Sequence, residues 1–101
     1  MIKYEIHFDE NKIKTDGYYT PEHLYYVLDT IMNEVHFKKT GNGTYMENGT
    51  EDEIETAITV LIFTLFSEDW FVRYADKWLS YEDGEVEDVL AIQRKVALRN
   101  E

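Results

Sequence analysis

Acidic side chains are the chemistry-bearing residues that concentrate in one part of this 101-residue chain. The segment 47–88 holds thirteen Asp and Glu residues against two basic residues, Arg73 and Lys77, whereas the rest of the chain has eight acids and eight bases. The formal net charge of −11 therefore belongs to this segment. A field of this sign repels nucleic acid and anionic membranes and attracts cationic surfaces. The segment predicts binding to a basic partner rather than a reaction.

Ten of these acids form a predicted acidic face that binds a basic protein surface, with no direct contact to nucleic acid or membrane. Carboxylates on such a face can copy the phosphates of nucleic acid and occupy the cationic groove of a DNA- or RNA-binding enzyme. Charge reversal at Asp83 and Glu87 should then slow association more than it speeds dissociation. The competing interpretation is a solvated face, because several of the acids start predicted helices. The predicted face comprises Glu51, Asp52, Glu55, Glu68, Asp69, Glu82, Asp83, Glu85, Glu87 and Asp88.

Aromatic residues support a second hypothesis, in which the protein is a structural or regulatory adaptor. Neighbours such as Trp70 and Phe71 cannot both face one core, so some rings should be exposed or should pack on another element. An adaptor of this kind self-associates or docks on a protein through Trp70, Trp78 and Tyr81, as a monomer or a homodimer. Ordinary core packing of these rings is the competing interpretation.

Indications of catalysis are weak. His7, His23 and His36 lack the spacing that places two metal ligands on one helical face, and the chain has no cysteine. Neither Ser67 nor Ser80 lies in a nucleophile motif, and no Gly-rich phosphate loop is present. We therefore expect a non-enzymatic protein without a metal or cofactor. A small acid/base enzyme, the remaining alternative, would need a pocket carboxylate of shifted pKa.

The first third of the chain predicts the elements that position these residues. Residues 2–8 alternate apolar and polar side chains, which is typical of a half-buried strand. The turn residues 9–11 predict a hairpin in which 12–15 form a short return strand. Thr20, followed by proline, predicts the start of a helix over Pro21–Glu34.

A second hairpin is predicted over residues 37–47. The Asn42-Gly43 dipeptide accepts positive φ at both centres of a type I′ turn. Counting outward from this turn places Lys38 opposite Glu47, an oppositely charged cross-strand pair.

Helices are predicted for the remainder of the chain. Residues 50–53 form a capping box at the start of a helix over Glu51–Phe66, which is apolar on every side and should be central and buried nearly all round. A buried strand in its second half is the alternative, because β-branched residues are frequent there. Ser67 predicts the cap of a third helix that ends near Gly84, and a last helix follows from Val86.

The predicted fold is one α+β domain over residues 1–101, with a small antiparallel sheet of two hairpins packed against about four helices. The longest apolar run, with two threonines in it, has ten residues, about half of the roughly 20 that span a bilayer. The alternating N-terminal residues do not form the apolar stretch of a signal peptide, and the absence of cysteine suits a reducing compartment. We expect a cytoplasmic protein.

Two sequence patterns carry a resemblance to a known group of proteins. The run Thr40-Gly41-Asn42-Gly43-Thr44-Tyr45, followed by Trp70-Phe71 and Lys77-Trp78-Leu79, resembles small uncharacterised proteins of phages and integrative elements from low-GC Gram-positive bacteria. The resemblance covers the middle and C-terminal parts of the chain. It implies a short host-encounter protein that binds a host enzyme, including restriction or CRISPR nucleases, and it assigns no site residues.

Overall fold

Five strands and five helices are present over residues 1–99, the part of the chain that the computed structural model describes. In chain order they are β1 (Lys3–Phe8), α1 (Glu10–Asp16), α2 (Pro21–Glu34), β2 (Phe37–Gly41), β3 (Thr44–Glu47), α3 (Glu51–Phe66), α4 (Asp69–Tyr74), β4 (Ala75–Glu82), β5 (Glu85–Asp88) and α5 (Val89–Arg99). The strands form one antiparallel sheet in the order β2-β3-β1-β4-β5. The predicted α+β fold class with an antiparallel sheet is confirmed.

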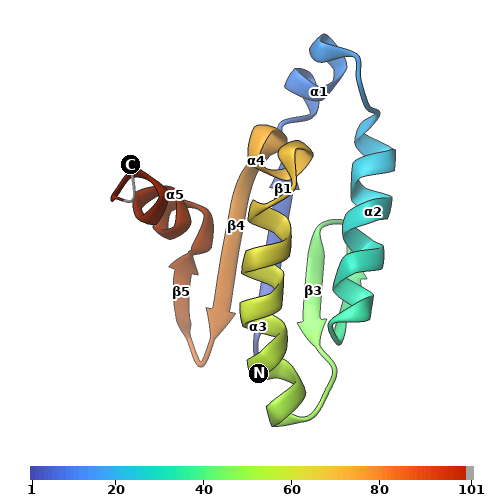
Figure 1. Ribbon diagram of the computed structural model, residues 1–101. Coiled ribbons are helices and arrows are strands. Elements are labelled where there is room, and N and C mark those ends of the chain that lie inside the picture. The colour runs from blue at the N-terminus through green and yellow to red at the C-terminus, as the bar shows by residue number, and fades with distance from the viewer. Residues whose placement is uncertain (100–101) are drawn as a thin grey trace.

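The helices cover one face of the sheet and leave the other face open. Figure 1 shows α2, α3 and α5 on the covered face, with α1 and α4 near the end of β1. Alternation along β1 sets the two faces, because Tyr4, Ile6 and Phe8 are buried in the core. Two helical connections separate β1 from β2 and β3 from β4. This order and connectivity match the split β-α-β, ferredoxin-like arrangement, extended here by β5 and α5.

Helices α2 and α3 begin where their caps were predicted. The Thr20 hydroxyl accepts the His23 amide, and the reciprocal capping bonds of Thr50 and Glu53 are both present. The prediction that α3 is buried nearly all round is wrong, because Val60 and Phe63 are 42% and 78% exposed. The sheet covers only one side of this helix, so its apolar outer side faces solvent.

The first predicted hairpin is also wrong, because its return strand is helix α1. The Asp9 carboxylate accepts the Lys12 amide and caps this helix, and Gly17 ends it at φ 77°. The single apolar residue of this helix, Ile13, is buried against the core. Local capping therefore outweighs the short alternating pattern.

The β2–β3 hairpin is confirmed, but its predicted register and turn type are wrong. Phe37 pairs with Glu47 and Lys38 with Met46, and a bulge follows Lys39. The predicted register would place Phe37 and Tyr45 on opposite faces, whereas the observed one buries both against the helices. Of the two turn residues, only Gly43 has positive φ, so the turn is not type I′.

The predicted third helix is largely strand. Helix α4 ends at Tyr74, and residues 75–82 form β4, which pairs with β1 along its length. Ser67 does not cap α4, because Glu68 occupies the N-cap and makes no side-chain cap bond. The predicted last helix begins later than expected, since 85–88 form β5 and only Val89–Arg99 are helical. Pairing with the central strand overrides the helical spacing of the apolar residues.

Candidate functional site

Carboxylates from three elements meet around one cleft at the end of the molecule where α3 begins. The cleft has a volume of about 430 Å³ and is lined by Glu47 from β3, Glu51 and Glu55 from α3, and Glu82 from β4. Figure 1 shows the first turn of α3 near the β4–β5 turn and the N-terminus at this end. The other lining residues of this acidic cleft are apolar: Met1, Ile2, Ile54 and Ile58.

Local structure fixes the backbone position of each of these acidic residues. The capping box sets where α3 starts, so Glu51 and Glu55 lie four residues apart on one side of the helix. Glu47 ends β3 and accepts the backbone amide of Ile2 at 3.0 Å. Glu82 ends β4 and lies opposite Glu85 in the hairpin, a pairing of like charges that opposes folding.

The electrostatics of this region are strongly negative. The pKa of Tyr4 is raised from 10.0 to about 12, first by burial of its ring and then by the negative charges of Glu82 and Glu87. Among the described residues, only Asp69 of the ten predicted acids pairs with a base, Arg73 at 3.5 Å. Glu51, Glu55 and Glu82 of the acidic cleft therefore make no ion pair with a described basic side chain.

The structure brings some of the predicted acids together and separates others. Glu51, Glu55 and Glu82 share the acidic cleft, and Glu87 lines a smaller cavity beside it, of about 170 Å³, that also includes Glu82. Asp52 lies on the other side of α3, in a cleft of about 380 Å³ with His36 and Glu53. The remaining predicted acids are exposed around the β4–β5 hairpin or near α4: Asp83, Glu85, Asp88, Glu68 and Asp69.

The predicted acidic face is therefore not one continuous face. Glu68 and Asp69 lie beyond the far end of α3, whose 16 residues place them about 24 Å from Glu51. Glu47 belongs to the acidic cleft, but it is not among the predicted contact residues. The position of Glu47 in the acidic segment indicated that it could contribute to an acidic site. The predicted cross-strand pair with Lys38 led instead to a structural interpretation of this residue.

The predicted aromatic face does not form, because Trp78 is fully buried. Its ring lies 5.5 to 5.8 Å from the rings of Tyr4, Phe71 and Phe66. The expectation that Trp78 is available to a partner is therefore wrong. Trp70 is half-buried on α4 beside Phe8, and Tyr81 is half-buried on the open face of the sheet, so these two rings share no surface with each other.

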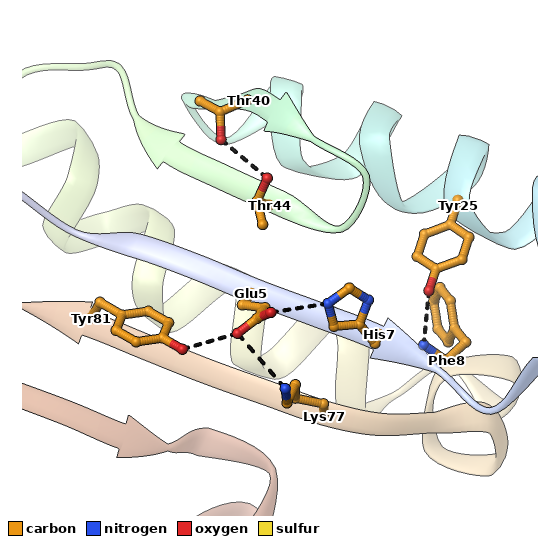
Figure 2. Close-up of polar contacts among 8 residues, drawn as sticks. All are labelled: Glu5, His7, Phe8, Tyr25, Thr40, Thr44, Lys77 and Tyr81. Carbon is orange, nitrogen blue, oxygen red and sulfur yellow. Dashed lines mark hydrogen bonds and ion pairs between the residues drawn. The ribbon is translucent and has the colours of Figure 1, made fainter.

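A second polar cluster, which sequence reasoning missed, lies on the open face of the sheet (Figure 2). Glu5 accepts a hydrogen bond from the Tyr81 hydroxyl at 2.9 Å, pairs with His7 Nε2 at 3.2 Å and lies 3.9 Å from Lys77 Nζ. The Tyr81 hydrogen bond, followed by that of His7, lowers the pKa of Glu5. A carboxylate held in this way stays charged at neutral pH and joins β1 to β4. The alternating pattern indicated which side of β1 these residues take but not their cross-strand partners.

Within residues 1–99, no three His, Cys, Asp or Glu side chains are arranged to hold a metal ion. None of the helices described there combines the length and apolar character needed to cross a membrane. No model of a known protein family matches the chain, and a search of curated proteins finds no significant match. The resemblance to phage and integrative-element proteins stays a prediction.

Proposed function

We propose that this protein is a non-enzymatic binding module whose acidic cleft takes a basic surface of a partner protein. One observation carries the proposal: carboxylates from β3, α3 and β4 line a single cleft, and no Lys, Arg or His side chain of the described residues lines it with them. Glu51, Glu55 and Glu82 are exposed, so a cationic partner can approach these charges closely, and the water that it displaces from the cleft would strengthen the attraction.

The cost of this arrangement to the fold supports a binding role over simple solvation. Glu51 stabilises the start of α3 and needs no partner to explain it. Glu82 differs, because it lies opposite Glu85 in the β4–β5 hairpin and lines the same small cavity as Glu87. Like charges held together lower stability unless a ligand compensates them.

The proposal has a finer form, in which the basic surface is the nucleic-acid groove of a host enzyme. The carboxylates would then occupy positions that phosphates take in the nucleic acid, and nucleic acid would compete with the protein for the enzyme. The resemblance to mobile-element proteins supplies the setting for this form, in which a short protein meets a host defence enzyme.

The test compares partners captured from a Gram-positive host lysate by three immobilised proteins, at low and at high salt. These are the natural protein, the double variant Glu55→Lys with Glu82→Lys, and the double variant Glu22→Lys with Glu10→Lys. The Glu22→Lys and Glu10→Lys variant has the same net charge as the cleft variant, but it carries its changes on α1 and α2. We expect basic nucleic-acid enzymes to bind the natural protein and the α1/α2 variant, and to be lost from the cleft variant and at high salt.

A captured enzyme is then titrated with the natural protein in the presence of labelled duplex DNA or RNA. Displacement of the nucleic acid would support the finer form. Partners that bind the cleft variant equally well, or whose affinity does not change with salt, would contradict the proposed function.

A further inference from the structure

A groove extends from the acidic cleft between α3 and α5. The cleft and the neighbouring cavity share Ile2, Ile58 and Glu82, so they adjoin and together form one depression. A third cavity, of about 290 Å³, adjoins the second at Gln93 and is also lined by Phe66 and Arg94. In Figure 1, α5 lies to the left of β4, beside β5, and α3 lies to the right of β4, so β4 runs between the two helices in this view.

The wall that α3 contributes changes character along its length. The residues Glu51, Glu55, Ile58, Ile62 and Phe66 follow one another at steps of three or four, so they form a row on one side of the helix. Each of them lines part of the depression. The groove is therefore acidic where α3 begins and apolar where α3 ends.

The wall from α5 is mostly apolar and partly exposed, although it includes Gln93 and Arg94. Val89 and Ile92 face the middle cavity, and Val96 lines the third cavity. Ile92 and Val96 are 44% and 43% exposed, although they lie beside other apolar side chains. Covering these side chains would release ordered water and favour binding.

We infer that this groove binds an amphipathic peptide segment of the partner protein, with apolar side chains between α3 and α5 and Lys or Arg side chains over the acidic cleft. The inference rests on the proposed function, because the cleft supplies the acidic end of the groove. Charge complementarity favours a basic segment at the acidic end of the groove. At the other end, apolar side chains of the ligand would bind better than charged ones. The row along α3 extends for about 22 Å, which about seven extended residues would cover.

The test uses two fluorescein-labelled peptides of about fifteen residues with the same net charge. One has a leucine-rich half and a lysine-rich half, and the other has serine in place of each leucine. Fluorescence anisotropy measures their affinity for the intact protein. We expect the leucine peptide to bind at least about tenfold more tightly, because two buried leucines contribute more than that factor.

Substitution of the groove residue Ile92→Ser should remove most of this preference. Val60→Ser is the matched control, because Val60 is 42% exposed against 44% for Ile92 and lies on α3 outside the groove. Thermal unfolding establishes that both variants fold. The control should keep the preference for the leucine peptide.

The outcomes separate the two proposals. Equal affinity for the two peptides, or equal effects of Ile92→Ser and Val60→Ser, would overturn the groove inference. The proposed function would survive that result if Glu55→Lys with Glu82→Lys still weakened the binding of both peptides. Failure of that double variant to weaken either peptide would overturn both proposals.

Discussion

Tyr4 shows at the scale of one residue how the acidic cleft and the core influence each other. Its ring stacks on Phe37 at 4.8 Å and meets the edge of Trp78 at 5.5 Å, so it is part of the packed interior. Its hydroxyl is close enough to Glu82 and Glu87 for both charges to oppose ionisation. The neutral form is therefore strongly favoured in the folded state.

This shift predicts how stability depends on pH. The pKa of Tyr4 is about 12 when folded and near 10.0 when unfolded, so the unfolded state loses its proton first and gains stability as pH rises above 10. Tyr4→Phe removes this penalty and keeps the ring. Between pH 9 and pH 11 the variant should lose about 1 kcal/mol less of its free energy of unfolding than the natural protein.

Urea unfolding at several pH values measures this difference. Tyr18→Phe is the control, because Tyr18 is 74% exposed and lies outside the core. The natural protein and the control should lose stability in parallel. An identical decline in the Tyr4→Phe variant would contradict the assigned environment of Tyr4.

At the scale of elements, the β2–β3 hairpin contacts β1 through its turn. The Ile6 amide donates to the Gly43 carbonyl at 2.7 Å, and Gly43 has a φ of 78°. A Cβ atom at position 43 would lie 2.4 Å from the Ile6 carbonyl oxygen. The turn therefore requires glycine for its backbone angle and also for its close approach to the central strand.

Comparing two glycine substitutions separates these requirements. Gly84 in the β4–β5 turn has a similar φ of 82°, but a Cβ there would meet no atom within 4 Å. Gly84→Ala should cost about 1–2 kcal/mol of stability through backbone strain alone. Gly43→Ala should cost clearly more in the same denaturant titration, because β1 and the turn must also move apart. Equal losses in the two variants would show that the hairpin does not contact β1 so closely.

Two helices with local caps, α2 and α3, were predictable from the sequence, whereas elements set by distant pairing were not; α1 was missed despite its Asp9 cap, because the alternating residues 12–15 favoured a strand. Thr50 and Glu53 are three residues apart and fix the start of α3 without help from the rest of the chain. Trp78, in contrast, sits at helical spacing from Tyr74 but lies in β4, because β1 pairs with that segment. The acidity of the candidate site could likewise be predicted from the sequence. That Glu47 and Glu82 line the same cleft could not, because it depends on the order of strands in the sheet.

At the scale of the whole molecule, the charge of −11 is unevenly distributed, and its repulsion acts against the folded state. Added salt screens such repulsion, and at 0.1 M exposed charges that are more than about 10 Å apart interact only weakly. We therefore expect the thermal midpoint of the natural protein to rise with NaCl concentration.

A single neutralisation locates the source of this effect. Glu82→Gln should raise stability at low salt, by about 0.2–1 kcal/mol, because it removes the like-charge pair with Glu85. The gain should disappear at high salt. Glu22→Gln, in the first turn of α2, should produce no such gain, because a negative charge there favours the helix. A gain from Glu82→Gln that persists at high salt would indicate a cause other than electrostatic repulsion.

The position of β1 in the sheet has a consequence for the order of events during synthesis. This strand is synthesised before the other four, yet its neighbours are β3 and β4, so one of its edges has no partner until residues 75–82 have been made. The backbone groups on that edge of β1 therefore lack their partners while residues 9–74 are synthesised. During that interval the open edge of β1 is available for pairing with another chain, so the late synthesis of β4 is the step that closes this route to aggregation.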